Sequence, residues 1–198
     1  MEKLVLYNGP TSPFGRKTKV TAIVQKINIE EKIIKVHESE FLDRLNPLRK
    51  IPTLVVNDSQ TIIDSDNICL YFDKISTKET IFNTENYWEI ISITSVANGL
   101  MEAVLERRME MVRPLNEQSQ NFIKKQEIRA LRTINWLEKN WSGYKNNKIS
   151  MDQISVACAL EYTKYRFTDV WDKECKNLNQ WLENFGSNKF MKQTAPSE

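Results

Sequence analysis

The sequence predicts two domains of different class, an α/β domain followed by an all-α domain. In the first third of the 198 residues, short apolar segments with strand character alternate with segments of helical periodicity. Residues 76–86 are polar and lack periodicity, which indicates a linker. Beyond this linker, apolar residues recur at helical spacing and no hairpin signal returns.

The first domain begins with a strand and a helix. Residues 3–7 form a compact apolar strand, which the turn sequence Asn8-Gly9-Pro10 ends. A helix starts at Ser12-Pro13, because serine is a good N-cap and proline is pre-organised for the first helical position. Its apolar residues predict one buried face: Val20, Ile23, Val24 and Ile27.

A second strand and a hairpin follow. Residues 31–36 favour the strand, and a loop or short helix spans residues 41–45. Residues 51–56 and 61–63 predict an antiparallel hairpin, because residues 57–59 between them are the turn sequence Asn-Asp-Ser.

The last helix of the first domain begins near Asp64-Ser65 and buries Ile68, Cys69, Tyr71 and Phe72. The order strand, helix, strand, helix, two strands and helix is the layout of a thioredoxin-like α/β domain. We place this domain at residues 1–76, the linker at 77–86 and the helical domain at 87–198.

Apolar spacing organises the second domain into long helices. One starts at Tyr87 and stops before Pro114, and another spans residues 123–141. A further helix starts at Ser150, whose side chain can cap it while Gln153 accepts a hydrogen bond from the Ser150 N–H.

Composition excludes several classes of enzyme. The five glycines form neither a G-x-G-x-x-G nor a G-x-x-x-x-G-K-[ST] pattern, which excludes the common nucleotide-binding loops. His37 is the single histidine, so multi-histidine metal sites are impossible and we expect no metal. The net charge of +2 arises from interspersed basic and acidic residues, which argues against nucleic-acid binding.

Cysteine usage and hydropathy indicate the compartment. Cys69, Cys158 and Cys175 are widely spaced and odd in number, which fits a reducing compartment better than a disulfide framework. The N-terminal apolar segment is too short for a signal peptide, and no apolar run approaches the roughly 18 residues that span a bilayer. We therefore expect a cytoplasmic protein that does not contact a membrane.

The first candidate site is the strand-to-helix turn Thr11-Ser12-Pro13-Phe14. Free N–H groups and the dipole at a helix N-terminus would stabilise an anionic sulfur, and the Ser12 hydroxyl could donate a hydrogen bond to it. The alternative is that Ser12 caps its own helix and does nothing else. Thr11 and Tyr7 are rival hydroxyl donors.

The second candidate site combines residues 46–54 with Asp64-Ser65. Pro52 belongs at a strand start or an edge, where an extended peptide can add as a further strand. A cis bond at Ile51-Pro52 would aim the Ile51 backbone outward, although cis is the minority form of X–Pro bonds. Asp64-Ser65 offers a carboxylate, a hydroxyl and backbone N–H groups, or it is only a helix cap.

Together these motifs resemble the cytosolic glutathione S-transferases that use a catalytic serine. In the first domain the resemblance rests on Ser-Pro-Phe at 12–14, Asn-Pro-x-x-Lys-Ile-Pro-x-Leu at 46–54 and Asp64-Ser65. Segments of the second domain resemble a bacterial serine-type subgroup: Asn98-Gly99-Leu100-Met101, Arg113-Pro114, residues 156–160, Trp181 and Thr194-Ala195-Pro196. The resemblance covers essentially the whole chain and implies the glutathione transferase fold, a thioredoxin-like domain followed by a helical-bundle domain.

The resemblance implies a function and a site. Ser12 would donate a hydrogen bond to the thiolate of glutathione, which then attacks a small electrophile in conjugation or reductive cleavage. Lys50 would bind the glycyl carboxylate, Ile51 beside a cis Pro52 would pair with the cysteinyl backbone, and Asp64 with Ser65 would hold the γ-glutamyl end. The implied second-substrate pocket consists of Phe14, Met101, Leu105, Arg108, Met109 and Val112.

The resemblance further implies a homodimer with a detoxifying role. Arg107 and Arg108 either favour an anionic co-substrate or form salt bridges. Asp64 stands where many members have glutamate, and Gln153 where relatives usually carry aspartate. The alternative function is that of a non-catalytic binding or regulatory protein on the same scaffold. A disulfide reductase is disfavoured, because no cysteine lies at the start of the first helix.

Overall fold

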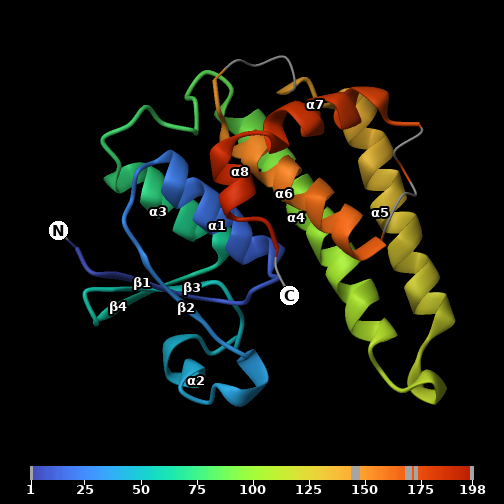
Figure 1. Ribbon diagram of the computed structural model, residues 1–198, viewed down its shortest axis with the longest axis horizontal. Coiled ribbons are helices and arrows are strands. Elements are labelled where there is room, and N and C mark those ends of the chain that lie inside the picture. Colours follow the sequence, from blue (N-terminus) through green and yellow to red (C-terminus); the bar gives the residue numbers. More distant parts are fainter. Residues whose placement is uncertain (1, 144–147, 168–170, 172–173, 197–198) are drawn as a thin grey trace. The chain divides into compact units, whose positions relative to one another are not determined.

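The structure is a computed structural model that describes residues 2–143, 148–167, 171 and 174–196 (Figure 1). Its contacts divide the chain into two compact units. Unit 1 comprises Met1–Phe82 together with Lys189–Glu198, and unit 2 comprises Asn83–Asn188.

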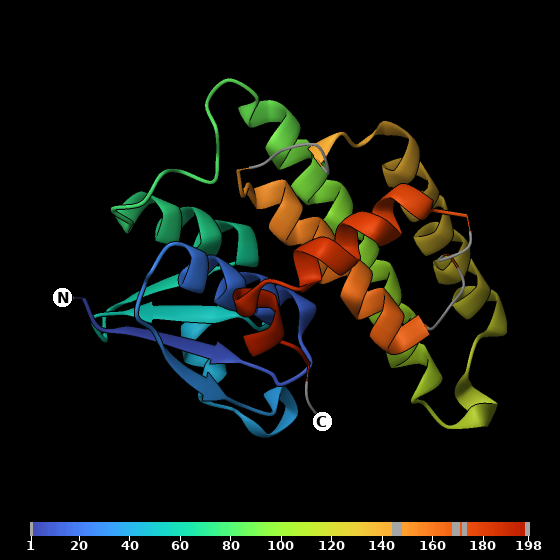
Figure 2. The ribbon, with the colours of Figure 1, turned by 45° about the horizontal axis from the view of Figure 1, so that its top comes forward.

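Unit 1 is built on a four-stranded sheet in the order β2-β1-β3-β4 (Figure 2). The strands are β1 (Leu4–Asn8), β2 (Glu30–Ile33), β3 (Thr53–Val56) and β4 (Gln60–Ile63). β1 runs parallel to β2 and antiparallel to β3, and β3 runs antiparallel to β4. This is the predicted thioredoxin-like sheet, and each predicted strand is confirmed with its ends moved by one to three residues.

The β3–β4 hairpin forms as its turn sequence predicts. Asn57 and Asp58 adopt φ values of 51° and 57°, and two consecutive residues with positive φ characterise the tight turns that suit twisted strands. Asparagine and aspartate tolerate this conformation better than other residues that carry a side chain. Val55 pairs with Thr61 across the hairpin.

Two helices cover one face of the sheet and a short one lies on the other face (Figures 1 and 2). α1 (Pro13–Val24) and α3 (Ser65–Ile75) form the first layer, while η1 (Val36–Glu38) and α2 (Leu42–Leu45) lie on the opposite side. α8 (Lys189–Gln193) contacts α1. The core of the unit joins the sheet to the helix layer: Leu4, Leu6, Ala22, Leu54, Val56, Ile68 and Phe72.

The burial of α1 differs from the predicted apolar face. Val20 is fully buried, but Ile23 is 40% exposed, whereas Arg16, Lys17 and Thr21 are buried. The reason is that polar groups brought from elsewhere in the chain satisfy these side chains. Lys17 forms an ion pair with Asp66 of α3, and Thr21 donates to the Lys17 carbonyl over 3.0 Å.

Unit 2 is all helical, as predicted. It contains α4 (Tyr87–Met111), η2 (Leu115–Glu117), α5 (Gln120–Asn140), α6 (Met151–Phe167) and α7 (Lys176–Gly186). α4 contacts both α5 and α6, and α6 is buried along most of its length. In the part of the chain that the structure describes, no helix combines the length and the apolar character that crossing a membrane requires.

The cap of α6 confirms the predicted capping box. The Ser150 N–H donates to the Gln153 side-chain oxygen over 3.1 Å, and the Gln153 amide donates to the Gly143 carbonyl over 2.7 Å. Asp152 accepts from the Trp141 indole over 2.7 Å and also from the Ser150 hydroxyl.

The C-terminal segment departs from the predicted domain division. Residues 189–198 were assigned to the helical domain, but they group with unit 1. The Arg16 guanidinium donates to the Met191 carbonyl over 3.1 Å and to the Thr194 hydroxyl over 3.4 Å. Because the partner of Arg16 lies 175 residues away, no local pattern announces this contact.

Candidate functional site

The strand register gathers the predicted site segments at one end of the sheet. Tyr7 near the end of β1 pairs with Thr53 at the start of β3, and Thr53 pairs with Ile63 at the end of β4. The segments that leave or enter the strands at this end are therefore neighbours. They are the Ser12 turn, Ile51-Pro52 and Asp64-Ser65.

Gly9 shows how closely the first two segments approach each other. A Cβ atom placed on Gly9 would lie 2.7 Å from the Ile51 Cδ1 atom and 3.9 Å from the Ser12 Cβ atom. The first distance is shorter than real Cβ contacts, so any side chain here would push Ile51 away from the Ser12 turn. Glycine at this position keeps the two segments together.

Ser12 is the N-cap of α1, as predicted. Its Oγ atom accepts a hydrogen bond from the Gly15 N–H over 3.1 Å, and Pro13 occupies the first helical position. Capping uses a lone pair of the hydroxyl oxygen and leaves the O–H proton free to donate. The capping role and the thiolate-donor role are therefore compatible, and Ser12 is partly exposed.

The rival donor Tyr7 is engaged in packing. Its ring lies 5.2 Å from the Phe41 ring, centroid to centroid, and the Lys32 ammonium lies 6.0 Å from the Tyr7 ring. Thr11 is partly exposed beside Ser12 but does not cap the helix. Of the three hydroxyls, only that of Ser12 is fixed at a helix N-terminus.

The Ile51-Pro52 peptide bond is cis, as the resemblance implies. Asn46 organises the loop that precedes it, because its side-chain amide donates to the Lys50 carbonyl and to the Thr53 hydroxyl, both over 2.9 Å. Among the backbone hydrogen bonds of the described residues, none involves Ile51, which lies just before the first paired residue of β3. Its peptide groups are available to an extended chain laid along this edge.

Asp64 and Ser65 begin α3. Asp64 is the N-cap, and its carboxylate accepts from the Asp66 N–H over 2.8 Å. Its backbone adopts φ 79° and ψ 134°, a conformation that residues with a side chain seldom adopt and that is common at binding sites. Ser65 is 5% exposed. The adjacent Asp66 forms the ion pair with the buried Lys17, which joins the first turn of α3 to α1.

These residues suit an extended anionic tripeptide such as glutathione. Lys50 is exposed, and its carbonyl accepts from Asn46 and Thr53, so the loop fixes its backbone and leaves its ammonium in solvent. The N-terminus of α3 offers N–H groups to a carboxylate, and the Asp64 carboxylate can meet an ammonium. The donor set contains what both ends and the middle of the peptide require.

The residues predicted for the second-substrate pocket fall in different environments. Phe14 belongs to unit 1 and is partly exposed, whereas the other five lie on α4 in unit 2. Met101 is fully buried in its unit and Leu105 is partly exposed. Arg108, Met109 and Val112 are exposed.

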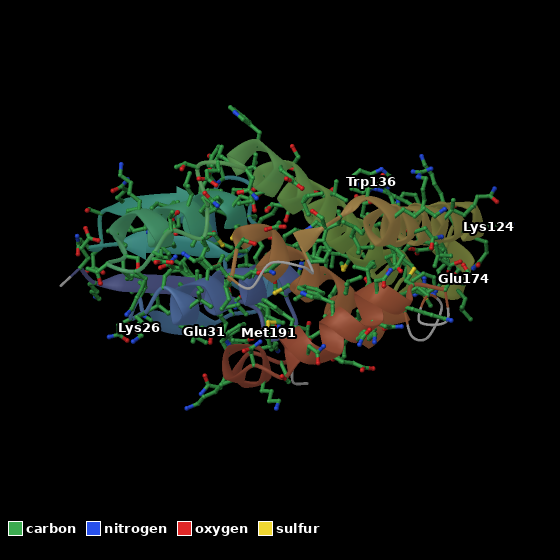
Figure 3. All side chains as sticks on the ribbon, turned by 90° about the horizontal axis from the view of Figure 1, so that it is seen from above. Lys26, Glu31, Lys124, Trp136, Glu174 and Met191 are labelled. Carbon is green, nitrogen blue, oxygen red and sulfur yellow. The ribbon has the colours of Figure 1, made fainter. Side chains whose placement is uncertain are left out.

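Sequence reasoning did not identify one hollow region of unit 2. A concavity of about 700 Å³ lies along α5 next to Glu106 of α4. It is lined by Asn121, Phe122, Lys124, Lys125, Gln126, Ile128, Arg129 and Arg132. Figure 3 shows Lys124 and Trp136 on this helix. Because these side chains follow ordinary helical spacing, the pattern of an exposed helix face conceals the region.

The described residues contain no cluster of three or more histidine, cysteine, aspartate or glutamate side chains that could bind a metal. The three cysteines are free and buried.

Comparisons with known proteins agree with this site. Residues 6–80 match the family model of the glutathione S-transferase N-terminal domain. Over 196 residues the chain is 26% identical to the uncharacterized GST-like protein YibF of Escherichia coli K12, covering 94% of this chain and 95% of YibF.

Solved structures share the whole architecture. A glutathione transferase family member from Pseudomonas fluorescens Pf-5, determined with bound glutathione, is 25% identical with a TM-score of 0.92, and the match covers 99% of this chain and all of that one. A glutathione S-transferase from Methylobacillus flagellatus KT with glutathione bound is 24% identical with a TM-score of 0.91, covering 98% of this chain and all of that one.

These findings support the glutathione S-transferase family and show that the chain has its fold, a thioredoxin-like domain with a helical domain. The glutathione-bound relatives place the predicted ligand among those that proteins of this fold bind.

Proposed function

We propose that the protein is a glutathione transferase of the bacterial serine type, in which Ser12 stabilises the thiolate of glutathione for attack on a small electrophile. One observation carries the proposal. The Ser12 hydroxyl, fixed as the N-cap of α1, lies at the same end of the sheet as the open backbone of Ile51 and the N-terminus of α3.

The chemistry requires little of the protein beyond these groups. A free thiol with a pKa of about 8.5 is only about 3% ionised at pH 7, and a fall of about 2 units makes the thiolate the major form. This shift corresponds to about 2.7 kcal/mol, which one charge-assisted hydrogen bond and a helix N-terminus can supply. The thiolate then forms a carbon–sulfur bond while the leaving group departs with its bonding electrons. No histidine base is needed.

Glutathione would bind in an extended form along the β3 edge. Ile51 beside Pro52 would pair with the cysteinyl backbone, and the Lys50 ammonium would meet the glycyl carboxylate. Asp64 and Ser65 would hold the γ-glutamyl ammonium and carboxylate. The second substrate would contact Phe14 and the α4 residues Met101, Leu105, Arg108, Met109 and Val112, with Met101 supporting the others from inside the helical unit because it is fully buried.

We also propose a cytoplasmic homodimer that detoxifies electrophiles. Light scattering after gel filtration measures the assembly, and a mass near twice 23.3 kDa is the expected result. A mass that stays near 23.3 kDa across micromolar concentrations contradicts it.

The Ser12→Ala variant tests the catalytic role. We expect kcat/KM for an aryl halide to fall by about 10²-fold, because one donor to the reacting atom is lost. The thiol pKa of bound glutathione, followed by the ultraviolet absorbance of the thiolate, should rise by about 2 units. Thr11→Ala and Tyr7→Phe are the matched controls, and both should retain the activity.

Two outcomes contradict the proposal at different points. Unchanged turnover by Ser12→Ala removes Ser12 from the mechanism. Tight glutathione binding without turnover of any electrophile by the unaltered protein makes it a non-catalytic binding protein.

A further inference from the structure

Three arginines gather where α4 meets the end of α6 in unit 2. Arg107 and Arg108 are neighbours on α4, and Arg166 lies in the last turn of α6. The Arg107 guanidinium donates to the Arg166 carbonyl over 3.4 Å, so the two helices meet at these residues. We call Arg107, Arg108 and Arg166 the arginine cluster.

Arg107 has a structural role that uses its charge. It forms an ion pair of 2.8 Å with Glu127 of α5, and its side chain is only 14% exposed. Its guanidinium also lies 4.2 Å from the centre of the Phe167 ring. A guanidinium held by a carboxylate and by an aromatic face is not available to a ligand.

Arg108 and Arg166 carry charge that the described residues do not neutralise. No ion pair joins either guanidinium to a carboxylate within the described ranges. Arg166 stacks on the Tyr165 ring at 4.3 Å, and its Nε atom is shielded from solvent with no hydrogen-bond partner. A shielded guanidinium N–H without an acceptor is costly, and an anionic acceptor would remove that cost.

Tyr162 adds a third donor. It lies one helical turn before Arg166 and is 3% exposed. Burial raises the pKa of its hydroxyl, and the nearby charges of Arg166 and Arg108 oppose this rise without cancelling it. The phenol is therefore protonated at neutral pH and can donate a hydrogen bond. That both charges act on it means that the three groups lie close together.

We propose that Arg108, Arg166 and Tyr162 form a binding site for the carboxylate of the electrophilic substrate. The inference rests on the proposed function and names the class of its second substrate, a small aromatic or apolar electrophile that bears a carboxylate. A planar guanidinium matches the two oxygens of a carboxylate, and a neighbouring O–H completes the set. The aromatic faces of Tyr165 and Phe167 suit the apolar body of such a molecule better than a strongly hydrated phosphate.

The test measures binding, so that it works whether or not the protein turns substrate over. Calorimetry compares two glutathione thioethers, S-(4-carboxy-2-nitrophenyl)glutathione and its 4-carbamoyl counterpart, which differ in a carboxylate against a neutral amide. We expect the unaltered protein to bind the carboxylate at least tenfold more tightly. This preference should weaken as the salt concentration rises.

Variants assign the preference to the site. Arg166→Gln and Arg108→Gln should each reduce the preference to about threefold or less and leave the affinity for the amide unchanged. Tyr162→Phe should reduce it less, because only one neutral donor is lost. Arg132→Gln on α5 removes the same charge from another exposed arginine and should keep the full preference. Thermal unfolding checks that each variant is folded.

Each remaining outcome overturns the inference. Equal binding of the two thioethers, failure of both to bind when S-methylglutathione binds, or an equal effect of Arg132→Gln refutes the carboxylate site and leaves the proposed function standing. If S-methylglutathione does not bind either, the proposed function fails and the inference fails with it.

Discussion

Gly15 occupies a position in α1 where no side chain fits. A Cβ atom there would lie 1.5 Å from the Oδ1 atom of Asn8, a buried residue whose amide donates to Glu31 over 2.9 Å. We expect Gly15→Ala to lower the free energy of unfolding by about 3 kcal/mol, because overpacking forces a buried side chain to move. Urea unfolding measures the change.

Gly99 provides the control, since it also lies inside a helix. A Cβ there would meet only the Arg129 guanidinium at 3.6 Å, an ordinary contact. Gly99→Ala should therefore raise the free energy of unfolding by up to about 1 kcal/mol, the difference in helix propensity. If both substitutions had the same sign, the close approach of Asn8 to α1 would be wrong.

Tyr71 gives unit 1 a pH dependence at the alkaline end. Its hydroxyl donates to Glu2 over 2.8 Å, and burial first, then this hydrogen bond and the charge of Glu2, raise its pKa to about 12. The unfolded chain releases this proton near pH 10, so the contribution to stability is present below pH 10 and is lost as the pH rises through 12.

Two measurements check this expectation. Ultraviolet titration should detect one tyrosine near pH 12 that Tyr71→Phe removes. Glu2→Gln should lower this pKa only in part, because burial is the larger cause. A complete return to pH 10 in Glu2→Gln would show that Glu2, and not burial, dominates.

At the scale of single elements, the cap of α6 depends on Gln153. Its side chain accepts from the Ser150 N–H and donates to the Gly143 carbonyl, and it is 2% exposed. Gln153→Ala leaves both backbone groups without these bonds, so we expect a loss of about 2 kcal/mol in thermal or urea unfolding.

Two further variants define this prediction. Gln153→Glu keeps the acceptor for Ser150 but loses the donor to Gly143, and it should fall between the alanine variant and the unaltered protein. Gln120→Ala, at the exposed start of α5, should be close to neutral. The prediction is refuted if Gln153→Ala costs no more than Gln120→Ala.

The elements also explain which features sequence reasoning could reach. The Ser150 cap and the turn at residues 57–59 were predictable because the groups that form them lie within a few residues of each other. The Ser12 cap belongs to the same class. The burial of Arg16 and Lys17 was not predictable, because their partners Met191 and Asp66 come from distant helices.

The candidate site shows the same limit. Ser12, Ile51-Pro52 and Asp64-Ser65 were recognisable as motifs, whereas their common location depends on strand register. The separation of Arg107 from Arg108 was equally hidden. Adjacent arginines look alike in a sequence, but Glu127 engages only the first of them.

At the scale of the whole molecule, Arg16 ties the chain's last described helix to its first. Figure 3 shows Met191 on α8. Loss of the hydrogen bonds from Arg16 to Met191 and Thr194 in Arg16→Gln should speed amide hydrogen exchange in residues 189–194 by about tenfold, while the β-strand amides keep their rates.

Lys19→Gln is the matched control for this experiment. Lys19 lies on the same helix, carries the same charge and pairs with Glu31 of β2 over 2.9 Å instead of contacting α8. It should leave exchange in residues 189–194 unchanged. Equal protection in Arg16→Gln and the unaltered protein would show that Arg16 does not anchor α8.

The return of residues 189–198 to unit 1 has a consequence for how the protein is made. Unit 2 is inserted between two pieces of unit 1, and all of its residues leave the ribosome before the second piece does. Domains usually mature in the order of synthesis, from the N-terminus onward. Here the helical unit can be complete while α1 still lacks the partner of Arg16, so the half that carries Ser12 is the last to be finished.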